Sequence, residues 1–403
     1  MTTEGVRELI VSYRKNILIK DDKVVIDGKD TELPNGVTAE DFARKETRSF
    51  YKTFLSSHFE NLILLTGAGS SIGIGANGKI GKTRKELWES IEATIGQKEL
   101  QEFASLIKYQ YPNKGEIGDV EEMLSKANNA AKFVEEIKER KLSISETIKS
   151  IQQQIVLECG LTLPDHSPHE ILLSRITARK VKFPRVKIFT LNYDTLFEQA
   201  AQRGAYTVID GFSFSLPRRF NGKYYDLDIV VRENSRIQNE ENYVPHVFHL
   251  YKPHGSLDWE KLDGEVIKND KTKDPLIIYP KDSKYESSYE QPFFEMMSRF
   301  QENLRQNNVL LIVVGFSFYD KHIKTMILEA VKVNPSFRLL IVTPEIADND
   351  YLNDFRIIAR SYNNVILLDE TFSEFVNTYP YPDVYKGLNI AIKKEDIEGA
   401  FEE

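Results

Sequence analysis

NLILLTGAGSS, residues 61–71, is a short apolar run that leads directly into a glycine-rich loop. The run Asn61–Thr66 predicts a buried strand, and Gly67 begins the loop. Glycines at such a junction let the backbone approach a pyrophosphate, whose charge backbone N–H groups and a following helix N-terminus would stabilise. The spacing departs from the usual dinucleotide fingerprint, because Ile72 stands where a third glycine would fall. A tight glycine turn is the alternative interpretation.

Further apolar runs follow along the chain, and helical patterns separate most of them. The strands expected from these runs are Val186–Thr190, Val247–Tyr251, Pro275–Tyr279, Val309–Val314, Phe337–Val342 and Val365–Leu368. Runs rich in leucine and β-branched residues, alternating with helices, indicate a parallel sheet that is covered on both faces. The predicted fold class is therefore α/β, a Rossmann-like parallel sheet with helices on both faces, a helical insertion, and N- and C-terminal extensions.

The predicted domain organisation has three parts. They are an N-terminal extension (1–58), a central domain (59–345) with a helical insertion at about 97–180, and a C-terminal extension (346–403). The N-terminal extension predicts a helix at Val6–Lys15, a small β-like unit from Ile17, and a second helix at Ala39–His58 capped by Thr38. It carries no recognisable chemistry, so we expect it to pack on the central domain or on another subunit.

Composition and charge narrow the classes of function. The 403 residues are 41% hydrophobic with a net charge of −8, which argues against direct nucleic-acid binding and against a membrane coat. The longest apolar runs are too short to span a bilayer. The single cysteine, Cys159, excludes an internal disulfide and a four-thiolate zinc site, and it fits a reducing cytoplasm. We therefore expect a soluble, cytoplasmic protein.

Polar residues follow the predicted strand Val186–Thr190. Asn192 and Asp194 lie just past its carboxyl end, where ligands collect in open α/β sheets. Thr195 and Glu198 have the spacing of a capping box for the next helix, and Asp194 could equally cap it. Asn192 has no such structural duty, so it is the better candidate for function.

Two more strand ends carry candidate residues. In PHG (253–255), His254 sits on a defined loop after an apolar strand and would serve as a general base near neutral pH. In GFSFYD (315–320), Gly315 and Ser317 would bring backbone and a hydroxyl to a ribose or phosphate. Asp320 is expected to cap the helix that follows it, and Thr343 marks a final strand end.

GAGSS, TLNYD, PHG and GFS in this order resemble the sirtuin (SIR2) family over roughly residues 59–345. HGSLDW and GFSFYD are more similar to the SIR2-like NADases of bacterial antiphage defence systems, in particular to the SIR2 subunit of SIR2–HerA type systems. The resemblance implies NAD⁺ bound across the strand ends, with Asn192 and His254 as the catalytic pair. The residues it places around NAD⁺ are Gly67, Ala68, Gly69, Ser70, Ser71, Asp194, Gly315, Ser317 and Thr343.

The chain also departs from deacetylating sirtuins. It lacks the four cysteines of their zinc module, and residues 72–88 do not contain their Pro-Asp-Phe-Arg element. The spacing of His166 and His169 could imitate a metal pair, but the surrounding Ser-Pro predicts a loop, and no metal is expected. Water then becomes the expected acceptor, so the resemblance implies that NAD⁺ is hydrolysed to ADP-ribose and nicotinamide.

Other functions stay open at this point. The same site could serve a protein deacylase or an ADP-ribosyltransferase, or a non-catalytic sensor of NAD⁺ or ADP-ribose. A nuclease is also conceivable, although no clustered acidic metal site stands out in the sequence. Because unregulated NAD⁺ loss would kill a host cell, the resemblance further implies control by homo-oligomerisation and by a partner such as a HerA-type ATPase.

Overall fold

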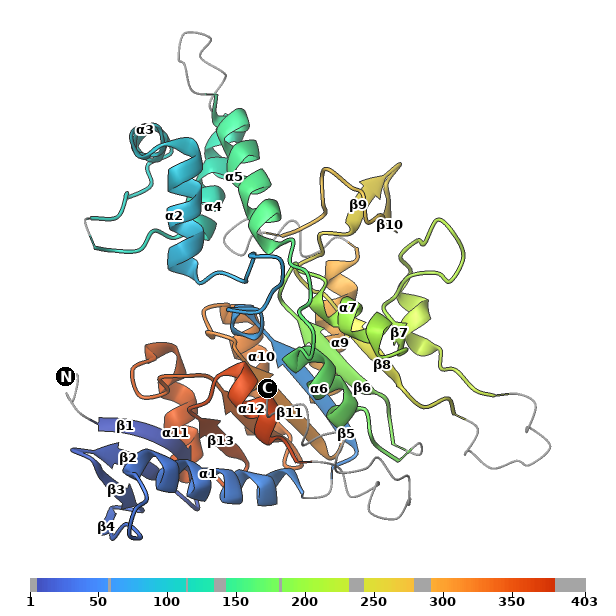
Figure 1. Cartoon of the computed structure of the whole chain (residues 1–403). Helices are drawn as coiled ribbons and strands as arrows, with labels where there is room; N and C mark the ends of the chain where they lie inside the picture. Colours follow the sequence, from blue (N-terminus) through green and yellow to red (C-terminus); the bar gives the residue numbers. More distant parts are fainter. Residues whose placement is uncertain are drawn as a thin grey trace.

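A mostly parallel sheet forms the centre of the computed structural model (Figure 1). The structure describes residues 6–56, 59–113, 115–133, 143–180, 183–231, 243–278 and 291–380. The parallel strands, in their order across the sheet, are β13 (Val365–Leu368), β12 (Arg338–Val342), β11 (Val309–Val314), β5 (Asn61–Thr66), β6 (Val186–Thr190), β8 (Val247–Tyr251) and β7 (Thr207–Ile209). This arrangement confirms the predicted α/β fold class.

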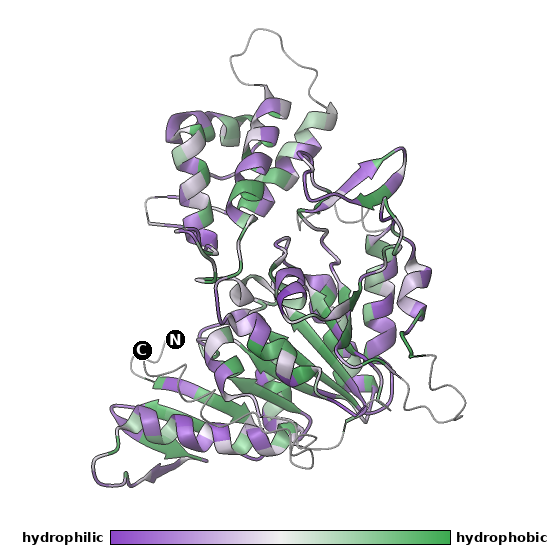
Figure 2. Cartoon of the chain, turned by 45° about the vertical axis from the view of Figure 1, so that its right-hand side comes forward, coloured by the Kyte–Doolittle hydropathy of each residue, from purple (hydrophilic) through white to green (hydrophobic). Residues whose placement is uncertain are grey.

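Both faces of this sheet are covered, as the continuous apolar runs predict. All six residues of β11 are buried, and they point alternately into two different cores. One core is completed by α9 (Phe293–Leu304), α10 (Lys321–Val333) and α11 (Asn353–Ser361). The other is completed by α1 (Ala39–Leu55), α6 (Pro168–Ile176), α7 (Leu196–Arg203) and α12 (Phe372–Thr378). Figure 2 shows the resulting hydrophobic strands between amphipathic helices.

The N-terminal segment is part of the sheet, and its predicted first helix is wrong. Instead of a helix at Val6–Lys15, β1 (Val6–Ser12) pairs antiparallel with β13. An antiparallel meander continues through β2 (Ile17–Lys20), β3 (Lys23–Ile26) and β4 (Lys29–Thr31). The second helix is confirmed as α1, with Thr38 accepting a hydrogen bond from the Asp41 amide; residues 57–58 lie outside the described residues.

Four helices form a separate module beside the sheet (Figure 1). They are α2 (Arg84–Ile95), α3 (Gln97–Leu106), α4 (Val120–Phe133) and α5 (Ile144–Cys159). Their buried side chains, including Trp88, Phe103 and Ile151, make a core of their own. The module thus begins before the predicted insertion and ends before α6, whose Leu172 and Leu173 pack on the sheet.

Two further local predictions fail. Residues 275–278 form no named strand; Ile277 makes only an isolated bridge to Gly255, and Tyr279 lies outside the described residues. The nearby hairpin is made by β9 (Trp259–Leu262) and β10 (Glu265–Lys268). His169 is not in a loop, because Ser167 and Glu170 form a capping box that starts α6.

The C-terminal part supplies β13, α11 and α12 to the same sheet and its cores. Arg175 of α6 holds α12 in place by donating to the carbonyls of Val376 and Tyr379. Residues 381–403 of the predicted extension lie outside the described part of the chain. Among the helices that are described, none is long and apolar enough to cross a membrane.

We predict that His169 makes the fold sensitive to acid. Its ring is fully buried between Phe197 and Phe372, and burial lowers its pKa to about 4. The unfolded chain would bind this proton near pH 6.5, so the stability of the fold falls as the pH drops from about 6.5 to 4. The free energy of unfolding should be lower at pH 5 than at pH 7, and His169→Leu should reduce this difference by about 2 kcal/mol. Denaturant unfolding at both pH values measures it.

The matched control is the same substitution at His166, whose side chain is exposed. It should leave the difference between pH 7 and pH 5 as it is in the unmodified protein. An unchanged difference in His169→Leu would show that other groups cause the acid sensitivity.

Candidate active site

The glycine loop lies at the point where the strand order reverses. The chain proceeds from β5 to β6 and β8 on one side, and then returns to β11 and β12 on the other. Such a switch point is where open α/β sheets bind ligands. Gly67 and Gly69 lie against Gly315: a Cβ at Gly69 would come within 2.6 Å of the Gly315 Cα. The glycines therefore allow two loops to approach each other at the backbone.

The amides of this loop are partly used within the fold. Gly67 N–H donates to the Val314 carbonyl (3.2 Å), and Gly69 N–H donates to the Gly315 carbonyl (2.9 Å). Ala68, between them, is exposed. These bonds hold the loop to the end of β11. Gly67 and Gly69 therefore serve to pack the loop against Gly315. Their predicted contact with NAD⁺ stays a prediction.

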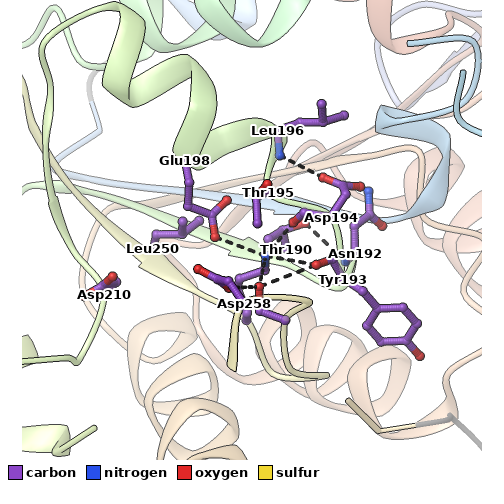
Figure 3. Close-up of polar contacts among 12 residues, drawn as sticks. Thr190, Asn192, Tyr193, Asp194, Thr195, Leu196, Glu198, Asp210, Leu250 and Asp258 are labelled. Atoms are coloured by element: carbon purple, nitrogen blue, oxygen red, sulfur yellow. Dashed lines mark hydrogen bonds and ion pairs between the residues drawn. The ribbon is translucent and has the colours of Figure 1, made fainter. Parts of the chain in front are cut away.

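Asn192 contacts the glycine loop directly. Its side-chain amide donates to the hydroxyls of Ser70 (3.1 Å) and Ser71 (2.8 Å), and the Ser71 hydroxyl donates to Asp194 Oδ2 (2.7 Å). Figure 3 shows Asn192 and Asp194 side by side at the end of β6. The structure thus brings together four of the predicted site residues, from two strand ends.

Asp194 also starts α7, and the predicted capping box is wrong. The Leu196 amide donates to Asp194 Oδ1 (3.1 Å), whereas the Thr195 side chain makes no capping bond. Glu198, the expected partner of Thr195, turns instead toward Lys252, whose Nζ lies 3.1 Å from its Oε1. The Asp194 carboxylate thus bonds the start of α7 through Oδ1 and Ser71 through Oδ2.

His254 occupies the corresponding position on the neighbouring strand. Phe189 of β6 is in register with Tyr251 of β8, so Asn192 and His254 each lie three residues past a paired position. Residues at the same register of parallel strands emerge at the same edge of the sheet. The His254 side chain is only 8% exposed. The site therefore contains both predicted catalytic residues at adjacent strand ends.

A carboxylate faces the His254 ring. Asp320 Oδ2 lies 3.4 Å from His254 Nε2, while Oδ1 accepts hydrogen bonds from the His322 and Ile323 amides at the start of α10. The predicted capping role of Asp320 is confirmed, and its contact with His254 is new. Three strand spacings of about 4.8 Å separate β8 from β11. The loops after these strands therefore meet above the ends of β5 and β6.

Lys252 lies between the loops that carry Asn192 and His254, and it was not among the residues predicted from the sequence. It is 1% exposed, and its ammonium contacts the Asp194 carbonyl (2.5 Å), the Ser256 hydroxyl (2.7 Å) and Glu198. Burial works to raise the pKa of Asp258, but Lys268 and Lys252 hold that pKa below its usual value. The one sequence signal for this role is that Lys252 and Ser256 stand two residues before and two residues after His254.

The remaining predicted residues lie on the β11 and β12 side of the switch point. Ser317 is exposed, and its hydroxyl accepts from the Tyr319 amide at 3.4 Å. Thr343 is buried at the end of β12, where its amide donates to the Leu368 carbonyl. In the part of the chain that the structure describes, no group of three or more His, Cys, Asp or Glu side chains could hold a metal ion.

Comparison with known proteins finds a family model that matches part of the chain. Residues 186–365 match the family model of the SIR2-like domain. The matched segment contains Asn192, Asp194, His254, Gly315 and Asp320, and it begins after the glycine loop. A solved structure described as "Structural Basis for the Mechanism and Regulation of Sir2 Enzymes" aligns with 83% of this chain and 97% of its own, at 11% identity and a TM-score of 0.35. No curated protein matches the sequence.

Proposed function

We propose that this protein is an NAD⁺ glycohydrolase, which cleaves NAD⁺ to ADP-ribose and nicotinamide. The observation that carries the proposal is that Asn192 and His254 follow adjacent parallel strands at equivalent register positions, with Asp320 Oδ2 3.4 Å from the histidine ring. The SIR2-like segment supports NAD⁺ as the substrate, since it spans these residues. The glycine loop at the switch point offers a place for the pyrophosphate.

The reaction breaks the bond between ribose C1′ and the nicotinamide nitrogen. Nicotinamide leaves with the bonding electron pair and becomes neutral, so it needs little acid assistance. Asn192 orients the attacking water or a ribose hydroxyl, and His254 accepts the proton that water loses as it bonds to C1′. The Asp320 carboxylate stabilises the resulting imidazolium. The protein's task is to shield the oxocarbenium-like transition state and to position the nucleophile.

Water is the acceptor that this chain favours. The only cysteine is Cys159, so the chain cannot build the four-cysteine zinc module of deacetylating sirtuins. A helical module with its own core, α2–α5, follows the glycine loop in the chain instead. Deacylation and ADP-ribosyl transfer remain the alternative fates of the same intermediate, because both begin with the same bond cleavage.

Product analysis distinguishes these fates. The purified chain is incubated with NAD⁺, with and without an acylated lysine peptide, and the products are separated by chromatography. We expect ADP-ribose and nicotinamide in equal amounts, independent of the peptide. Acyl-ADP-ribose that appears only with the peptide would overturn hydrolysis in favour of deacylation.

We further propose a cytoplasmic antiphage effector that acts by NAD⁺ depletion. Its activity would be held in check by homo-oligomerisation and by a partner protein such as a HerA-type ATPase. The resemblance of HGSLDW and GFSFYD to bacterial defence NADases supports this role. Adding a candidate partner or nucleic acid to the NAD⁺ assay tests it, because the partner should change the rate of nicotinamide release.

Asp320→Asn separates the two roles of this carboxylate. Asparagine caps a helix about as well as aspartate, so the melting temperature should stay close to that of the unmodified protein. The neutral amide cannot stabilise protonated His254, so NAD⁺ turnover should fall at least ~10-fold. Asp354→Asn is the control, because Asp354 pairs with Lys324 farther along α10. Unchanged turnover in Asp320→Asn would remove Asp320 from the mechanism.

A further inference from the structure

The buried side chain of Lys252 joins the loops that carry Asn192 and His254. Lys252 precedes His254 by two residues, and its ammonium reaches across to the carbonyls of Tyr193 (3.4 Å) and Asp194 (2.5 Å). These two residues directly follow Asn192. Ser256, two residues after His254, bonds the same ammonium at 2.7 Å. Both flanks of His254 are thus anchored at one point on the Asn192 loop.

A second link runs beside the ammonium. The Leu257 amide donates to the Tyr193 carbonyl at 3.0 Å, and the Ser256 hydroxyl bonds Asp258 at 2.5 Å. Glu198 Oε1, 3.1 Å from the lysine, provides the counter-charge from the first turn of α7. A buried ammonium is tolerated only when hydrogen bonds and opposite charge satisfy it. Every partner of Lys252 named above belongs to one of the two loops or to α7, so the lysine has a defined place between them.

We propose that Lys252 is a positioning residue for NAD⁺ cleavage, which fixes the distance between Asn192 and His254 without touching the substrate. The proposal rests on the proposed function. A misplacement of about 1 Å between reacting groups can cost about 100-fold in rate. We expect NAD⁺ affinity, by contrast, to depend mainly on the predicted phosphate-binding loops after β5 and β11. Loss of the lysine should therefore lower kcat far more than it raises KM.

The test compares Lys252→Met with Arg175→Met. Arg175 is also a buried cation that donates to two backbone carbonyls, but it joins α6 to α12. We expect Lys252→Met to lower kcat by about 10- to 100-fold with KM within about 3-fold, and Arg175→Met to leave kcat per folded molecule unchanged. Equal kcat in the two variants, or a loss confined to KM, would overturn the proposal.

A double variant tests the mechanism of the effect. In a His254→Ala background, Lys252→Met should lower the residual rate by less than about 3-fold, because the pair that it positions is already broken. A full second loss would show general structural damage and would contradict the proposal. If Lys252→Met does not fold, Ser256→Ala removes one acceptor of the same ammonium, and kcat should still fall by several-fold.

Hydrogen exchange keeps this proposal distinguishable from the proposed function. The Leu257 amide, bonded to the Tyr193 carbonyl, should exchange at least about 10-fold faster in Lys252→Met than in Arg175→Met. Faster exchange with no NAD⁺ cleavage by the unmodified protein would mean that the tie exists and the proposed function is wrong. Unchanged exchange would mean that Lys252 does not join the loops, whatever the activity.

Discussion

Replacing His254 by alanine should lower NAD⁺ turnover at least ~100-fold, and Asn192→Ala should do the same. His254 is the only titratable group that the predicted pair supplies, and its ring is held by Asp320 at 3.4 Å. In the proposed mechanism, the attacking water would then have no proton acceptor. Asn192→Ala removes the amide that contacts Ser70 and Ser71. In the proposed mechanism, the same change would leave the water without the group that orients it.

Nicotinamide release at saturating NAD⁺ measures both effects. His246→Ala is the matched control, because His246 is exposed at the opposite end of β8. Its turnover should equal that of the unmodified protein. If the His254 and Asn192 variants also keep full turnover, the assignment of the catalytic pair is wrong.

Gly315→Ala should both destabilise the fold and weaken NAD⁺ binding. Gly315 has φ +62°, and an added Cβ would lie 2.6 Å from the Gly69 carbonyl carbon and 2.7 Å from the Ser70 nitrogen. Because these are backbone atoms, the loops after β5 and β11 must separate. We expect a loss of about 2–4 kcal/mol in the free energy of unfolding.

The control for this substitution is Gly78→Ala. Gly78 has φ +77°, yet nothing lies within 4 Å of the position that a Cβ would take, so alanine there introduces the same backbone strain without the contact. Gly78→Ala should lower the free energy of unfolding by about 1 kcal/mol. Calorimetric titration with NAD⁺ should show at least ~10-fold weaker binding for Gly315→Ala only. If both variants bind NAD⁺ equally well, the contact between Gly315 and Gly69 is not part of the NAD⁺ site.

Much of the central sheet could be predicted from local sequence. Asn61–Thr66, Val186–Thr190 and Val309–Val314 are continuous apolar runs, and each forms a strand with the predicted bounds. The helix predicted from Val6 was wrong because a short apolar run is compatible with either a strand or a helix. What decides its conformation is pairing with β13, more than 350 residues away, through contacts such as Ile10 with Leu368. No local pattern contains that information.

Several residues of the candidate site could be predicted from the sequence, but the contacts between them could not. Strand ends pointed to Asn192, His254 and Gly315, because the carboxyl edge of a parallel sheet collects ligands. The contact of His254 with Asp320 depends on two loops arching over intervening strands, which spacing along the chain does not show. Lys252 was hidden for another reason: a lysine beside a strand is usually exposed, and only the fold reveals that it is buried.

Nicotinamide release from NAD⁺, by the unmodified chain and by an Asn192→Ala/His254→Ala double variant side by side, tests the catalytic site most directly. The site described above predicts stoichiometric nicotinamide and ADP-ribose from the unmodified chain, and at least ~100-fold less from the double variant. Equal release from both proteins would contradict it, as would intact NAD⁺ after incubation of the unmodified chain with and without its partner.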